Sequence, residues 1–112
     1  MQSERRRHRS EKRGEALELM LDACRERSGA HALVISDEHG LLVAASGVDR
    51  IDAERIAAAM PWPLRPAQRA RLRTMSFRVG PADRVWVGVV GSEDYAKPMG
   101  EALAGARRIL AA

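Results

Sequence analysis

Residues 30–60 read AHALVISDEHGLLVAASGVDRIDAERIAAAM, and this stretch decides the fold of the 112-residue chain. Two apolar runs of strand length, residues 32–35 and residues 41–45, flank a short polar segment. In that segment Asp37 can accept hydrogen bonds from the turn backbone, and Gly40 can adopt the left-handed conformation that ends a hairpin loop. The stretch therefore predicts an antiparallel hairpin, and the alanine-rich sequence after it predicts a helix.

A further helix is predicted before the hairpin, over about residues 14–28. Leu17, Leu21 and Cys24 recur at helical spacing and form an apolar stripe, which charged residues cover on the other side. Gly29 follows, and a glycine there can adopt the left-handed backbone conformation that commonly ends a helix. Because Cys24 belongs to the apolar stripe, we expect it to be a core residue and not a nucleophile.

The helix after the hairpin is expected to end at Met60, because Pro61 disfavours a helical residue before it. Either Asp49 or Asp52 can cap its first turn, since a short carboxylate satisfies free backbone N–H groups. The alanines of this helix make its surface small and smooth, and apolar residues extend most of the way round it. This pattern indicates a helix that covers the sheet and also meets a second protein.

The rest of the chain repeats the order of hairpin and helix. Apolar and polar side chains alternate over residues 71–79, as in a strand with one solvent-exposed face. Residues 85–90 are apolar on both faces, as in a central strand. The last helix should begin near Tyr95, because Pro98 is tolerated only in a first turn. Residues 61–70 contain three prolines and are not expected to form a central strand.

The predicted order is therefore α-β-β-α-β-β-α, an α+β domain whose antiparallel sheet of four to five strands is covered by three helices. We expect one domain, residues 14–112, after an arm of residues 1–13. No apolar run approaches the ~20 residues that cross a bilayer. A single cysteine and the lack of a secretory signal favour a cytoplasmic protein.

The arm carries six basic and two acidic side chains, a net charge of +4 that equals the net charge of the whole chain. A basic segment with few apolar residues is expected to be disordered. It is either a solubilising tail or a contact for nucleic acid, anionic lipid or an acidic partner. Its candidate polyanion contacts are Arg5, Arg6, Arg7, Arg9, Lys12 and Arg13.

The sequence contains no catalytic constellation. It lacks a GxxxxGK[ST] phosphate loop, a CxxC pair and any zinc-type spacing of its three histidines. We therefore expect no catalytic residue, metal site or cofactor, and a protein that is not an enzyme. Gly88, inside the GVVG segment, is expected to permit close packing.

A second basic region extends from Arg55 to Ala82, with six arginines and no acidic residue. Trp62 and Phe77 add aromatic rings, so one interpretation is a nucleic-acid-binding module that uses this region together with the arm. The other interpretation is an edge strand whose charges prevent aggregation. Trp62 either folds over the edge of the domain or docks on another chain.

The chain resembles the Roadblock dynein-light-chain family, which is longin-like. The resemblance rests on a helix followed by GAHALVISDEHGLLVAASG, residues 29–47, and on VWVGVVGSEDYAKPMGEAL, residues 85–103. It implies a homodimer or heterodimer that serves as a platform for small Ras-like GTPases. In bacteria, some members of the family stimulate GTP hydrolysis by the GTPase. The implied contact surface is formed by the second helix and the third strand. It comprises Asp52, Ala53, Arg55, Ile56, Ala57, Ala59, Met60, Trp62, Arg73, Met75 and Phe77.

We therefore expect a bacterial, non-enzymatic scaffold that dimerises, binds a small Ras-like GTPase and can stimulate its GTP hydrolysis. The alternative function is nucleic-acid binding through the arm and residues 65–78. A third possibility is a structural subunit whose complex is indifferent to nucleotide.

Overall fold

The computed structural model describes the backbone of residues 2–81 and 83–111, and the side chains of residues 11–81 and 83–111. In chain order its elements are α1 (Gln2–Ser28), β1 (Ala32–Asp37), β2 (Leu42–Ser46), α2 (Arg50–Ala59), α3 (Pro66–Arg69), β3 (Leu72–Val79), β4 (Asp83–Val90) and α4 (Ala96–Ala111). No helix in the described part of the chain is both long and apolar enough to span a bilayer.

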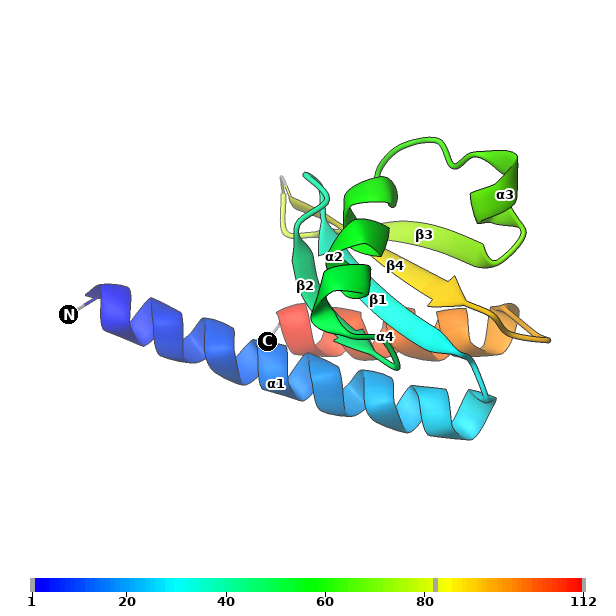
Figure 1. Ribbon diagram of the computed structural model, residues 1–112. Helices are drawn as coiled ribbons and strands as arrows, with labels where there is room; N and C mark the ends of the chain where they lie inside the picture. Colours follow the sequence, from blue (N-terminus) through cyan, green and yellow to red (C-terminus); the bar gives the residue numbers. More distant parts are fainter. Residues whose placement is uncertain (1, 82, 112) are drawn as a thin grey trace.

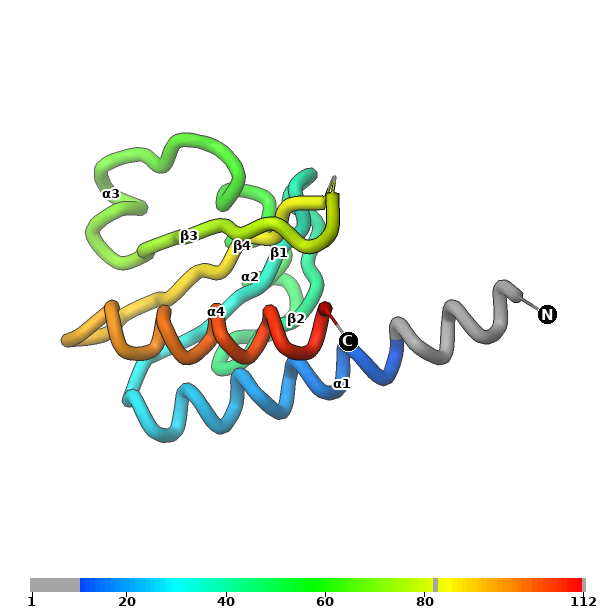
Figure 2. The backbone as a smooth tube through the Cα atoms, turned by 180° about the vertical axis from the view of Figure 1, so that it is seen from behind, coloured from blue at the N-terminus to red at the C-terminus, as the bar shows by residue number. Residues whose placement is uncertain are grey.

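The four strands form one antiparallel sheet in the order β2-β1-β4-β3. Helices α1 and α4 lie side by side across one face of this sheet, and α2 lies on the opposite face (Figure 1). The view from behind shows the same layers, with α4 in front of the sheet and α3 beyond the other face (Figure 2). Strand order leaves β2 and β3 as the two edges of the sheet.

Alternation along the strands divides the core into two clusters. Leu33 and Ile35 of β1 face the layer of α1 and α4, while Val34 faces α2. The larger cluster also includes Leu17, Leu21, Cys24, Phe77, Val85, Val87, Val89, Met99, Ala102 and Ala106. The smaller cluster includes Ala57, Met60 and Leu72. Both faces of β1 are therefore buried, as its uninterrupted apolar sequence predicts.

The β1–β2 turn forms as its sequence predicts. Asp37 Oδ1 accepts hydrogen bonds from the backbone N–H groups of His39 and Leu41, each at 2.9 Å. Gly40 has φ 81° and passes so close to α2 that a Cβ there would lie 3.0 Å from Ala58 Cα. Only glycine satisfies both the left-handed backbone and this close approach.

Helix α2 begins at the cap that the sequence offers. Asp49 adopts an extended conformation, and its side chain accepts a hydrogen bond from the Asp52 N–H at 2.8 Å. The helix ends at Ala59, with Met60 as the C-terminal cap. Met60 packs over β4 at Gly88, where a Cβ would lie 2.8 Å from Met60 Sδ. The predicted packing role of Gly88 is thereby confirmed.

The predicted α+β fold is confirmed, with four strands in the sheet. One element was not predicted: the short helix α3 within the proline-rich segment, which begins with Pro66 where a missing N–H costs nothing. Helix α1 begins before residue 14, since residues 11–13 are helical. The predicted disorder of the arm falls mostly on residues 1–10, outside the residues whose side chains the structure describes, and stays a prediction.

Candidate partner-binding surface

The outer side of α2 and the edge strand β3 form the surface to which the predicted contact residues map. Five of these residues are exposed and two are half-buried. The exposed ones are Asp52, Arg55, Trp62, Arg73 and Met75, and the half-buried ones are Ile56 and Ala59. This surface is therefore accessible in the single chain.

The other four predicted contact residues belong to the interior. Ala53, Ala57, Met60 and Phe77 are each at most 4% exposed. A side chain without exposed area cannot contact a partner, so these four are corrected from contact residues to core residues. The two alanines lie four residues apart and therefore share the face of α2 that packs on the sheet.

The strand β3 is a long and regular edge. Its eight residues pair with β4 without any shift in register, from Leu72 opposite Val90 to Val79 opposite Asp83. Its outer side has no neighbouring strand. Met75, in the middle of the strand, is 52% exposed although it is a large apolar residue. An exposed, regular edge of this length is a template for pairing with another chain.

The opposite edge is protected. Strand β2 has five residues, and its register with β1 is interrupted between Ile35 and Ser36. Short length and a bulge are two ways in which natural sheets prevent edge pairing. An open groove of about 750 Å³ follows this edge, with Glu18 of α1 and Glu54 of α2 on its sides. We therefore regard β3, and not β2, as the edge available to a partner strand.

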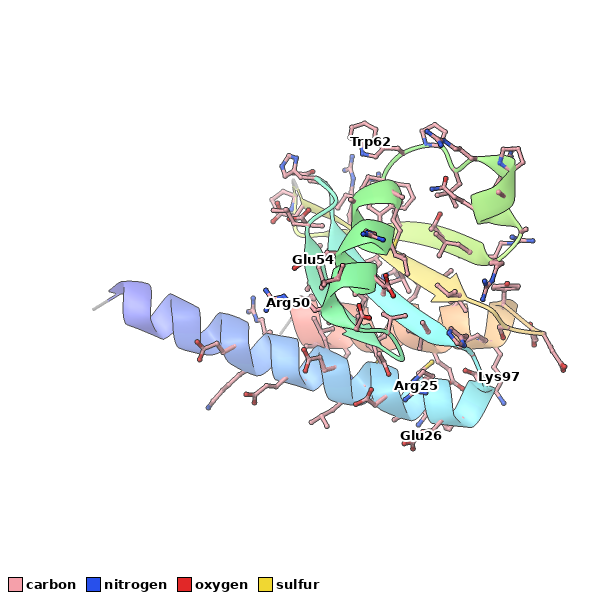
Figure 3. All side chains as sticks on the ribbon, viewed as in Figure 1. Arg25, Glu26, Arg50, Glu54, Trp62 and Lys97 are labelled. Carbon is pink, nitrogen blue, oxygen red and sulfur yellow. The ribbon has the colours of Figure 1, made fainter. Side chains whose placement is uncertain are left out.

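A smaller groove of about 470 Å³ separates α2 from α3. Its apolar lining includes Ile56, Leu72 and Val90, and its polar lining includes Arg55 and Arg71. Trp62 lies beyond the end of α2, on the side of the molecule away from α1, and is 63% exposed (Figure 3). Whether Trp62 folds over the edge of the domain or docks on another chain stays a prediction, and its exposure makes it accessible to a partner.

The arginines of the second basic region are all exposed. They lie on α2, in and beside α3, and on both faces of β3, where Arg73 and Arg78 point to opposite faces. Arg73 stacks over the Tyr95 ring at 5.0 Å and donates a hydrogen bond to the Arg69 carbonyl. From α4, Arg107 stacks over Phe77 at 5.5 Å. Arg55 and Arg71 also line the groove between α2 and α3 together.

The interior offers no reactive group to this surface. Cys24 is fully buried, and its thiol donates to the Pro98 carbonyl at 3.5 Å. Burial, reinforced by the nearby Glu101 carboxylate, raises the pKa of the Cys24 thiol to about 11. The prediction that Cys24 is a core residue is confirmed. Among the described residues, no three histidine, cysteine, aspartate or glutamate side chains are close enough to hold a metal ion.

Sequence reasoning missed one contact at the edge of the sheet. Arg84 of β4 donates a hydrogen bond to Ser76 Oγ of β3 at 2.7 Å. The two residues are separated by a turn, and their contact depends on strand register, which sequence alone does not specify. Only the short Gly80-Pro81 turn signal between the two strands could have indicated that they lie near each other.

Comparison with known proteins identifies the fold but no sequence relative. No protein-family model and no curated protein sequence matches the chain. Among solved structures the chain is similar to Myxococcus xanthus MglB, with a TM-score of 0.56 and 15% sequence identity. The similarity covers 88% of this chain and 86% of that chain. At this level of identity the comparison shows a shared fold, which is roadblock/longin-like.

Proposed function

We propose that this chain is a non-enzymatic regulatory module that forms a homodimer and binds a small Ras-like GTPase, whose GTP hydrolysis the complex promotes. The observation that carries the proposal is the roadblock/longin-like fold shared with MglB over most of both chains. The family resemblance in residues 29–47 and 85–103 supports it independently of the structure.

The described surface supports the dimer. Helix α2 packs mainly over β1 and β2, whereas β3 contacts the short helix α3 and α4. Trp86 of β4, on the face of α2, is only partly buried, and Met75 of β3 is exposed on the other face. A second copy that extends the sheet at β3 would satisfy the free edge of this strand. We therefore place the dimer interface at β3 and at the side of α2 that carries Ile56.

Regulation of a GTPase does not require chemistry from this chain. Most of the catalytic power in phosphoryl transfer comes from positioning and from electrostatic stabilisation by groups around the nucleotide. A partner that orders the switch loops of a GTPase can increase hydrolysis by holding the GTPase's own catalytic groups in place. We assign no arginine of this chain to the nucleotide site.

The direct test is a binding experiment with a purified small Ras-like GTPase. The purified chain is mixed with that GTPase loaded with GDP or with a non-hydrolysable GTP analogue, and complexes are separated by size-exclusion chromatography. We expect a stable complex that favours the GTP-analogue form, and faster phosphate release with GTP. No complex in either state would refute GTPase binding, and an equal complex in both states would indicate a structural subunit.

The part of the dimer interface on α2 can be tested with a matched pair of variants. Ile56→Glu places a charge at the proposed interface, so we expect light scattering to show that the dimer dissociates. Ile51→Glu is the control, because Ile51 is on the same helix, is 66% exposed and does not line the groove beside α3. A dimer that persists in Ile56→Glu would show that the dimer interface does not include this side of α2.

Nucleic-acid binding is the competing function, and it makes a different prediction. Binding through the arm and residues 65–78 would weaken steeply with salt and would fall when the arm is removed. Unchanged electrophoretic mobility of DNA and RNA at low salt would eliminate it.

A further inference from the structure

We propose that the groove beside β2 is a second protein-docking site, which takes a basic amphipathic helix of a partner protein. The groove lies at the edge of the sheet opposite to β3, and it shares no residue with the exposed contact residues of α2 and β3. The site is therefore separate from the dimer interface and adds a partner to the proposed function. Three observations lead to it: the apolar floor of the groove, the charge of its rim, and the irregular edge of β2.

The floor of the groove is an accessible apolar surface. It is lined by residues in and beside β2 and by small residues of α2, which are Leu41, Leu42, Val43, Ala44, Ala45, Val48, Ala53 and Ala58. Leu41 is 65% exposed, and Leu42, Val43 and Ala45 are half-buried. An open apolar groove of about 750 Å³ can bury the apolar side chains of another molecule.

The rim of the groove is acidic on the side of α1. Glu18 lines the groove, and Glu15 and Asp22 lie three positions before it and four positions after it, so the three carboxylates share one face of the helix. Asp22 accepts a hydrogen bond from Ser46 Oγ of β2, so this face is directed toward the edge of the sheet. Glu15 and Glu18 are exposed, and neither carboxylate has a hydrogen bond or an ion pair among the described residues.

The rim on the side of α2 carries charges that already balance each other. Arg50 and Glu54 both line the groove and form an ion pair, with Arg50 Nε 3.1 Å from Glu54 Oε1. Figure 3 shows these two side chains beside β2. The unpaired charge of the groove is therefore negative and comes from α1. Such a rim repels DNA, RNA and anionic lipid, and it attracts the lysine and arginine side chains of a protein.

The shape of β2 decides the conformation of the occupant. Ile35 pairs with Ala44 and Ser36 pairs with Leu42, so Val43 is an extra residue without a partner on β1. Such a bulge disrupts the regular edge that an added strand requires. A helix satisfies its backbone hydrogen bonds internally, so it can bury an apolar face in the groove without pairing to β2. The five residues of β2 extend over about 17 Å, which about eleven helical residues would span.

The basic arm of another copy of the chain does not match this description. Residues 2–13 carry six basic side chains but no apolar residue, so they cannot fill the floor of the groove. The occupant must combine apolar and basic side chains, and we therefore assign it to a different protein.

Fluorescence anisotropy with a labelled model peptide tests the site. The probe is LKKLLKLLKKLLKL, which as a helix has leucine on one face and lysine on the other. The control peptide is LEELLELLEELLEL, in which glutamate replaces each lysine. Because the whole chain has a net charge of +4, non-specific attraction would favour the glutamate peptide. We expect saturable binding of the lysine peptide and none of the glutamate peptide.

Three variants locate the binding. Glu18→Lys reverses the unpaired charge of the rim and should weaken binding of the lysine peptide about fivefold to tenfold. Glu26→Lys makes the same change on the same helix and should leave the affinity unchanged, because Glu26 does not line the groove and points away from the sheet (Figure 3). Leu41→Ser removes apolar area from the floor and should weaken binding about tenfold. All three residues are exposed, and circular dichroism checks that each variant folds.

The possible results discriminate among the occupants. No saturable binding of the lysine peptide, or equal effects of Glu18→Lys and Glu26→Lys, would overturn the docking site. Equal binding of the two peptides would overturn its preference for a basic partner. Light scattering that shows an assembly larger than a dimer, which Glu18→Lys reduces to a dimer, would assign the groove to a further copy of the chain instead. The peptide affinities do not depend on GTPase binding, so either conclusion can fail without the other.

Discussion

Replacement of Gly105 by alanine tests how closely the two helices on one face of the sheet approach each other. Gly105 lies in α4 and is buried against α1. A Cβ at this position would lie 2.6 Å from Met20 Cγ and 2.7 Å from Met20 Sδ. Because Cγ is near the backbone of α1, the Met20 side chain cannot relieve the overlap by moving its methyl end alone. The side chain must change rotamer or the two helices must separate.

Two opposing effects determine the result. Alanine is about 1 kcal/mol more favourable than glycine in a helix interior. Insertion of an extra methyl group into a packed contact costs about 1–3 kcal/mol. The packing cost should prevail, so we expect Gly105→Ala to lower the free energy of unfolding by about 1 kcal/mol. For a domain of this size that corresponds to a fall in melting temperature of about 4 °C.

Two further variants make the test specific. Gly100 lies on the same helix, is exposed, and has no atom within 4 Å of the position that an added Cβ would occupy. Gly100→Ala should therefore raise the free energy of unfolding by about 0.5–1 kcal/mol. In a Met20→Ala background, Gly105→Ala should become stabilising too, because the obstructing side chain is gone. Urea unfolding followed by circular dichroism measures all of these proteins, and the reasoning fails if Gly105→Ala stabilises the unmodified chain as Gly100→Ala does.

Two other predictions concern a helix cap and a buried thiol. Asp49→Ala removes the side chain that accepts a hydrogen bond from the Asp52 N–H, and thermal unfolding should show that the free energy of unfolding falls by about 1 kcal/mol. Asp49→Ser should retain most of this stability. Equal losses in the two variants would show that the cap is unimportant. The pKa of Cys24 is raised from 9.0 to about 11, so its contribution to stability is complete below pH 9 and is lost as the pH rises toward 11. We expect the stability advantage of the unmodified chain over Cys24→Ala to shrink by about 2–3 kcal/mol between pH 8 and pH 11, and a constant difference would contradict the burial of the thiol.

Short-range rules explain the parts of the fold that the sequence predicted. The turn at Asp37 and Gly40 and the cap at Asp49 depend on hydrogen bonds between residues at most four positions apart. The apolar character of both faces of β1 likewise follows from its own composition. Such features can be predicted because the atoms that form them are close in the chain whatever the tertiary structure is.

The candidate surface was predicted less completely, because accessibility depends on distant segments. An apolar residue such as Phe77 or Met60 can lie in the core or at an interface, and the sequence is compatible with both. The structure buries these two and exposes Met75, which has the same parity as Phe77 on the same strand. The difference comes from α4, whose Arg107 covers Phe77.

By itself, the sequence determined the identity and order of the main elements, the hairpin geometry and the absence of a recognisable catalytic motif. The tertiary structure alone decided the strand order β2-β1-β4-β3, the contrast between a bulged edge and a regular edge, and the contact of Arg84 with Ser76. The reason is physical: backbone hydrogen bonds between strands are the same for every sequence. Which strands become neighbours is therefore chosen by the packing of whole faces, to which residues far apart in the chain contribute together.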